Sequence, residues 1–68
     1  MIMKTIVRYM HSKDQVAYID GYLYNPNYGD LAAVVFPSTG TITTLNPQHL
    51  MVLPPDEQLR YNKEFGLI

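Results

Sequence analysis

The stretch from residue 32 to residue 53 constrains the fold more than any other part of the chain, because it alternates strand-like runs with turn signals. An aliphatic run leads into a tight turn at Gly40, whose missing Cβ allows the positive φ of a hairpin. After a second strand-like run, Asn46 and Pro47 favour a single 3₁₀ turn, because proline at the first helical position loses no useful hydrogen-bond donor. This order predicts strands over 31–36, 41–45 and 50–53, a hairpin turn over 37–40 and a 3₁₀ turn over 46–49.

The residues before this stretch predict two more strands. Residues 3–10 and 15–24 are rich in β-branched and aromatic side chains and alternate in character, as strands do. The polar residues 11–14 are expected to turn between them. Residues 25–30 contain an Asn-Pro step and a glycine, so a loop is expected there.

The tail has a different character. Two consecutive prolines should end the sheet, because proline cannot donate to a strand ladder. Asp56 is expected to cap a helix, Glu57 suits the first turn of that helix, and Gly66 can end it. We therefore predict a short helix that packs on the sheet or on a neighbouring copy, with a frayed tail as the alternative. This divides the chain into a β domain over 1–54 and a tail or short helix over 55–68.

Five short strands with a 3₁₀ turn before the last resemble an SH3-like small β-barrel over about residues 4–53. Within that class the chain is similar to the plasmid-borne type II dihydrofolate reductases, whose barrels form a tetramer with one central pore. In that family a Gly-Ser-Val-Gln-Ile-Tyr-Pro run precedes Ala-Leu and the last strand. Here residues 40–46 read Gly-Thr-Ile-Thr-Thr-Leu-Asn, and His49-Leu50 follows. The family's Gln-Ile-Tyr is replaced by Thr43, Thr44 and Leu45, so the resemblance implies the fold and self-association but not folate or nicotinamide binding.

Composition and charge exclude several classes of function. The chain has 68 residues, a formal net charge of −1 and no cysteine, so a thiolate zinc site is excluded. No Lys or Arg occurs between Lys13 and Arg60, and duplex binding needs clustered cations along the phosphates. No stretch approaches the roughly 20 apolar residues of a membrane span, and the start lacks a signal-peptide pattern. We expect a cytoplasmic protein.

Strict alternation along residues 15–24 predicts a core face and an outer face. The core face should hold Ala17, Ile19, Gly21 and Leu23, with Gly21 marking a sharp bend. The rest of the expected core is aliphatic or aromatic and comprises Val7, Val16, Val34, Phe36, Ile42, Leu50 and Val52; Val35 is expected to point outward.

The outer face is expected to be rich in tyrosine. Tyrosine offers a large rigid surface and a hydroxyl, so it is favoured at protein interfaces. It is also a good strand former, so an outward tyrosine needs no function. In SH3-like folds the ligand groove often lies beside the first two loops and the 3₁₀ turn. The candidate partner-binding residues are therefore Tyr9, Tyr18, Asp20, Tyr22, Tyr24, Tyr28, Pro47 and His49.

Catalysis and metal binding are not expected. His11 and His49 are far apart in the chain, and no carboxylate lies at ligand spacing from His49. The chain has no nucleophile elbow and no glycine-rich phosphate loop. A β domain of this size has little concave volume for a substrate. We expect no enzyme activity, no resident metal and no cofactor.

Three functions remain open. The first is a non-enzymatic module that binds another protein through the tyrosine face. Small cysteine-free chains of this kind are common among bacteriophage accessory proteins that inhibit or redirect host factors, which would place the protein in the host cytoplasm. The second is a homo-oligomer that holds a small molecule or nucleotide between subunits, by aromatic stacking and threonine hydroxyls. The third is single-stranded nucleic-acid binding, which the net charge disfavours.

Overall fold

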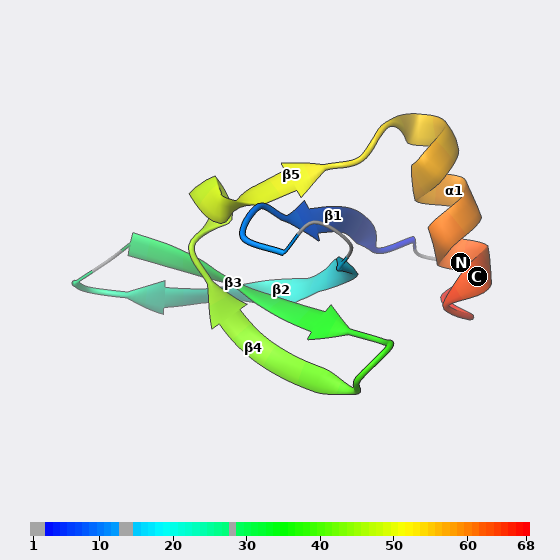
Figure 1. The fold of residues 1–68 in the computed structure, drawn as a ribbon. Coiled ribbons are helices and arrows are strands. Elements are labelled where there is room, and N and C mark those ends of the chain that lie inside the picture. The colour runs from blue at the N-terminus through cyan, green and yellow to red at the C-terminus, as the bar shows by residue number, and fades with distance from the viewer. Residues whose placement is uncertain (1–2, 13–14, 28) are drawn as a thin grey trace.

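The computed structural model describes residues 3–12, 15–27 and 29–68, and in these residues it forms one antiparallel sheet, a 3₁₀ turn and a helix (Figure 1). The strands follow the sheet order β4-β3-β2-β1-β5. The elements are β1 (Thr5–Tyr9), β2 (Val16–Asn25), β3 (Gly29–Phe36), β4 (Thr41–Leu45), η1 (Pro47–His49), β5 (Leu50–Val52) and α1 (Pro55–Glu64).

Local signals in the sequence located these elements well. The predicted strand over 41–45 coincides with β4, and Gly40 has the expected positive φ of 71°. Asn46 caps η1, because its side-chain oxygen accepts a hydrogen bond of 2.9 Å from the backbone N–H of Gln48. The loop predicted over 25–30 is shorter than expected, since β3 begins at Gly29. Residues 13, 14 and 28 lie outside the described part of the chain.

The sheet is not closed into a barrel, which corrects the predicted SH3-like barrel. Closure requires a ladder between the two outermost strands of the sheet, here β4 and β5. These strands are consecutive and are joined directly by η1, and the three residues of β5 pair with β1 instead. The sheet therefore folds over on itself while β4 remains an edge strand.

A β-bulge at Asp20 breaks the alternation of β2. Ile19 pairs with Val34, but Gly21 pairs with Ala33, so Asp20 is an extra residue in the ladder. Directly opposed residues of an antiparallel pair share a face. Tyr22 lies opposite the buried Ala32 and therefore shares the inner face of the sheet, while Tyr18 before the bulge lies on the outer face. The predicted single tyrosine face is therefore wrong.

The hydrophobic core lies on the inner face. Its buried members are Val7, Ala17, Ala32, Val34 and Phe36, with Tyr9, Ile19, Leu45 and Leu50 packed against them.

Most of the predicted core is confirmed, and four predicted members are wrong. Ile42 is 70% exposed because it lies opposite Val35 on the outer face of an edge strand. Val52 is 62% exposed because it belongs to the short edge strand β5. Leu23 is 55% exposed because the bulge moves it to the outer face of the hairpin. Val16 is only half-buried, Gly21 faces outward opposite Ala33, and Val35 lies on the outer face as expected.

The helix seals one edge of β1 through two side-chain amides. The Gln58 amide pairs with both backbone groups of Ile6, each at 2.7 Å. The Asn62 amide pairs with both backbone groups of Lys4, at 2.9 and 3.0 Å. Asn62 is fully buried and was not predicted as a core residue. The amides thus act as two further rungs of the ladder, beyond the end of β5.

The N-terminal end of α1 is not capped by the side chain that the sequence predicted. Pro54 is the N-cap and forms no side-chain cap hydrogen bond, so the prediction that Asp56 caps the helix is wrong. Asp56 and Glu57 instead lie in the first turn, where a carboxylate interacts favourably with the positive end of the helix dipole. Gly66 has a φ of 72°, and Leu67 N–H donates to the Asn62 carbonyl at 2.8 Å, so the predicted stop at Gly66 is confirmed.

Candidate partner-binding surface

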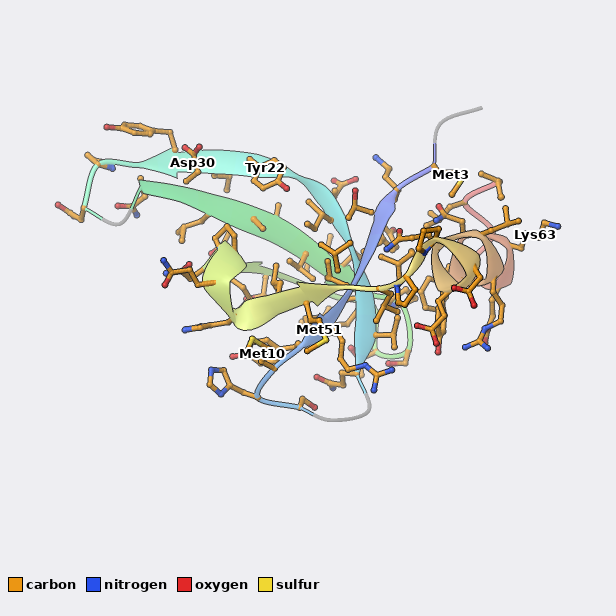
Figure 2. All side chains as sticks on the ribbon, turned by 90° about the horizontal axis from the view of Figure 1, so that it is seen from above. Met3, Met10, Tyr22, Asp30, Met51 and Lys63 are labelled. Carbon is orange, nitrogen blue, oxygen red and sulfur yellow. The ribbon has the colours of Figure 1, made fainter. Side chains whose placement is uncertain are left out.

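The far end of the β2–β3 hairpin exposes three consecutive large side chains. Tyr22 is 62% exposed, Leu23 is 55% exposed and Tyr24 is 77% exposed. Both views of the molecule show this end of the hairpin pointing away from α1 (Figures 1 and 2). The pairing of β2 with β3 places Tyr22 and Tyr24 on the inner face of the sheet. It places Leu23 on the outer face, opposite Leu31. The hairpin end therefore presents apolar surface on both sides.

Tyr18 and Asp20 do not belong to this surface. Tyr18 is half-buried and its ring lies 6.5 Å from the ring of Phe65, just after α1. Asp20 is exposed and forms an ion pair of 3.2 Å with Lys4, the residue before β1. These two predicted site residues therefore serve the junction with the N-terminal strand and the helix, and the bulge separates them from Tyr22 and Tyr24.

Tyr9, Pro47 and His49 gather at another place in the fold. Tyr9 is half-buried and contacts Phe36 edge to face, at 6.4 Å between ring centroids. Pro47 and His49 are exposed on η1. Tyr28, the remaining predicted site residue, lies outside the described residues. The eight predicted residues thus form no single surface, and their partner-binding role stays a prediction.

The structure brings His11 and His49 together, which the sequence did not indicate. Their ring centroids are 4.8 Å apart, and Tyr9 contacts His11 at 5.3 Å. The backbone N–H of Met10 donates to the His49 carbonyl at 2.9 Å and fixes the two segments side by side. Two imidazoles alone supply too few ligands for a metal centre. The described residues contain no group of three or more His, Cys, Asp or Glu that could hold a metal ion.

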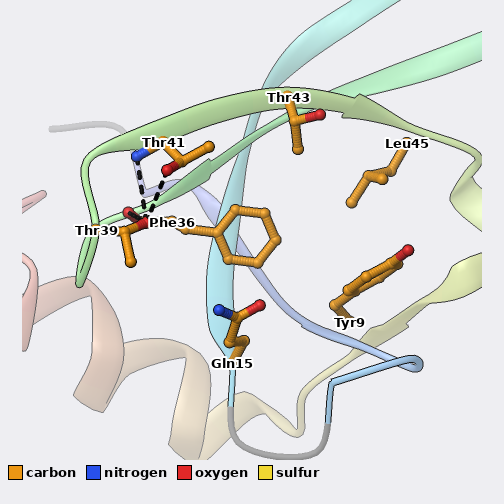
Figure 3. A pocket seen from close by; sticks show the side chains of 7 residues that line it. All are labelled: Tyr9, Gln15, Phe36, Thr39, Thr41, Thr43 and Leu45. Carbon is orange, nitrogen blue, oxygen red and sulfur yellow. Dashed lines mark hydrogen bonds between the residues drawn. The ribbon is translucent and has the colours of Figure 1, made fainter.

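An open groove of about 390 Å³ lies between β4 and the start of β2 (Figure 3). Phe36, Tyr9 and Leu45 give it apolar surface. Hydroxyls and an amide supply its polar groups, and the Thr39 hydroxyl donates to that of Thr41 at 2.9 Å. None of the described residues that line it is charged. They are Tyr9, Gln15, Phe36, Thr39, Thr41, Thr43 and Leu45.

Sequence reasoning missed this groove because it treated the threonines as ordinary exposed strand residues. The signal was the alternation of Thr41, Thr43 and Leu45, which places all three on the inner face of β4, opposite Phe36, Val34 and Ala32. An edge strand whose inner face has no further strand over it leaves that face open to a ligand.

The hairpin end and the groove also differ in charge. Asp30 on β3 is exposed and lies opposite Tyr24. Within the described ranges its carboxylate forms no ion pair, whereas Asp20 pairs with Lys4. The hairpin end is therefore acidic and aromatic, while the described lining of the groove is uncharged.

Comparisons of the chain with protein-family models, with curated proteins and with solved structures found no match. Within the part of the chain that is described, no helix has the length and apolar character to cross a membrane.

Proposed function

We propose that this protein is a non-enzymatic module that binds another protein through the end of its β2–β3 hairpin. The observation that carries the proposal is the exposure of Tyr22 and Tyr24 on the same face of the hairpin end, with Leu23 exposed on the other face. Single exposed apolar residues are normal on soluble proteins, whereas adjoining ones mark contact surfaces. Tyrosine is enriched at such surfaces because its large ring loses little conformational freedom on binding.

The hairpin suits this role because its strands are fully paired. The ladder runs from Tyr18↔Val35 to Asn25↔Gly29, interrupted only at the bulge. A paired backbone holds the tyrosines in place before a partner arrives, which lowers the entropic cost of association. The proposal therefore describes a preformed surface rather than a segment that folds on binding.

We also propose that the domain is an open relative of the SH3-like arrangement. The strand order β4-β3-β2-β1-β5 and the 3₁₀ turn before β5 support this. The function does not follow from the fold, because SH3-like domains serve many roles. A bacteriophage origin, inhibition of a host factor, self-association and a cytoplasmic location stay predictions.

Affinity capture with the full chain as bait tests the partner-binding proposal. The amount of a partner captured by the wild type should fall at least tenfold with the double variant Tyr22→Ala/Tyr24→Ala, as measured by quantitative mass spectrometry. Ile42→Ala is the matched control, since Ile42 is equally exposed but lies on β4. Circular dichroism should show that both variants fold. Equal capture by the wild type and the double variant would contradict the proposal.

The groove supports a second candidate function, the binding of a small neutral aromatic molecule. Its volume of about 390 Å³ falls within the roughly 300–1,000 Å³ of typical ligand pockets. Tyr9 and Phe36 offer aromatic surface, and threonine hydroxyls can bind polar edges. The groove lies within one chain, whereas the sequence had suggested pockets between subunits.

Thermal unfolding in the presence of nucleosides tests this second candidate. Adenosine or guanosine should raise the melting temperature, and the corresponding monophosphates should raise it less, because none of the described lining residues is cationic. Thr43→Val should remove the shift, while Thr44→Val on the other face of β4 should retain it. No shift with any nucleoside would remove this ligand class.

A further inference from the structure

The hairpin end combines exposed aromatic rings with a carboxylate on one face. Tyr24 lies directly opposite Asp30. Tyr22 precedes Tyr24 by two residues on β2 and lies on the same face of the sheet. Directly opposed residues have Cβ atoms about 4.5–5.5 Å apart, and diagonal neighbours are about 7–8 Å apart. Figure 2 shows Tyr22 and Asp30 on adjacent strands at this end of the molecule. We call these three residues, Tyr22, Tyr24 and Asp30, the hairpin patch.

The bulge at Asp20 creates the hairpin patch. Before the bulge, Tyr18 pairs with Val35 and Ile19 with Val34. Had that register continued, Tyr22 would lie opposite Leu31 on the outer face, and Asp30 would remain on the inner face with Ala32. The extra residue shifts the ladder by one position and places both tyrosines on the same face as Asp30. The bulge therefore selects which side chains meet on this face.

The carboxylate of the hairpin patch has no cation of its own. Asp30 forms no ion pair within the described residues, whereas the exposed Asp20 takes up the nearby Lys4 at 3.2 Å. The sequence contains no Lys or Arg between Lys13 and Arg60, and β2 and β3 lie inside that interval. An unneutralised carboxylate on the same face as two exposed tyrosines favours a cationic ligand and repels acidic peptides and phosphates.

We propose that the hairpin patch binds an arginine side chain presented by a partner protein, an inference that rests on the proposed partner-binding function. A guanidinium can pair with the Asp30 carboxylate through two parallel hydrogen bonds. Its flat faces can at the same time stack on the tyrosine rings. A lysine ammonium offers the charge without the planar geometry, so arginine is the preferred occupant.

Nuclear magnetic resonance of the ¹⁵N-labelled full chain tests this with a defined probe. The probe is the peptide acetyl-Gly-Ser-Arg-Ser-Gly-amide, and its twin carries neutral, isosteric citrulline in place of arginine. The arginine peptide should shift the amide resonances of the hairpin patch saturably, with a dissociation constant on the order of millimolar for one charge-assisted contact. The citrulline peptide should bind at least fivefold more weakly. Equal shifts by both peptides, or no saturable shift, overturns the proposal.

Two variants with the same net charge give the matched control. Asp30→Asn should weaken the arginine peptide about tenfold, a loss of about 1.4 kcal/mol. Asp20→Asn removes the same charge from the same hairpin and should leave the affinity unchanged, since Asp20 lies on the other face. Equal losses in the two variants would show a net-charge effect and overturn the proposal. Concentration-dependent shifts of the hairpin patch without peptide would assign it to a second copy and would also overturn it.

The inference and the proposed function can fail separately. If Tyr22→Ala/Tyr24→Ala releases a captured partner while Asp30→Asn retains it, the partner-binding function stands and the arginine inference fails. If the arginine peptide binds at the hairpin patch but the tyrosine variants retain the partner, the guanidinium site stands and the proposed function fails.

Discussion

The two ends of this small sheet differ in burial: the helix end is covered and hydrogen-bonded, and the hairpin end is exposed. At the helix end, Gln58 and Asn62 pair with the backbone of β1, and Ile6 and Leu53 are buried. At the hairpin end, Tyr22 and Tyr24 are mostly exposed although they face inward in register terms. The comparison indicates that the helix end secures the fold and the hairpin end is free to make contacts.

This division predicts that substitutions at the helix end affect unfolding and that substitutions at the hairpin end affect binding. A chain of 68 residues has a free energy of unfolding of only a few kcal/mol, so it can lose few buried interactions. Three substitutions probe the division, from the largest expected effect to the smallest.

Asn62→Ala should cause the largest loss. It leaves the N–H and C=O of Lys4 without their amide partner and removes a 2.7 Å hydrogen bond to the Gln58 carbonyl. Unsatisfied buried polar groups cost about 1–3 kcal/mol each, so we expect a loss of roughly 2–4 kcal/mol in urea denaturation. Lys63→Ala, the exposed neighbour on the same helix, is the control and should change stability by less than about 0.5 kcal/mol. Similar losses for both variants would show that the amide pairing does not stabilise the fold.

Val34→Ala should cost less than Asn62→Ala but far more than any change at the hairpin end. Val34 is fully buried on the inner face, so the substitution leaves a cavity and should cost about 1–3 kcal/mol. Leu23→Ala removes a larger side chain, yet we expect less than about 0.5 kcal/mol, because Leu23 is mostly exposed. Thermal unfolding of both variants measures the contrast. A larger loss for Leu23→Ala would reverse the assignment of the two ends.

Asp20→Asn should have the smallest effect. The Lys4–Asp20 ion pair is solvent-exposed, so its removal should cost about 0–0.5 kcal/mol. The loss of stability should be smaller still in about 0.5 M salt, because ions screen the attraction between exposed charges. Urea denaturation at low and high salt checks both points. A loss above about 1 kcal/mol would mean that the bulge depends on this pair.

Local signals in the sequence predicted the elements because each signal acts over a few residues. Gly40 and the Asn46-Pro47 step determine their turns regardless of what lies elsewhere. The inner and outer faces could not be predicted past Asp20, because a bulge depends on how β2 pairs with β3. One unrecognised extra residue reversed the assignment of Tyr22, Leu23 and Tyr24.

The contacts between distant segments were equally hidden from sequence reasoning. His11 and His49 meet only because β1 pairs with β5, which brings their flanking segments together. The burial of Asn62 depends on where the helix docks, although the spacing of Gln58 and Asn62 on one helix face was visible. Two amides four residues apart beside an apolar stripe were the available sign of a helix that pairs with backbone.

The amide seal of β1 also has a geometric limit. Four residues of helix rise about 6 Å, close to the roughly 6.6 Å that two residues of strand advance, so two successive amides meet two successive rungs. Each step of four residues also turns the side chain by about 40° around the helix axis, so a third amide would point away from the strand. Together the carbonyl of His49, strand β5, Gln58 and Asn62 pair with the backbone of β1 and of its two flanking residues, from Met10 back to Lys4. Residues 49–62 thus act as one composite partner strand. Truncation of the chain before Gln58 would uncover the start of β1 as a free strand edge, and such edges recruit other chains into aggregates.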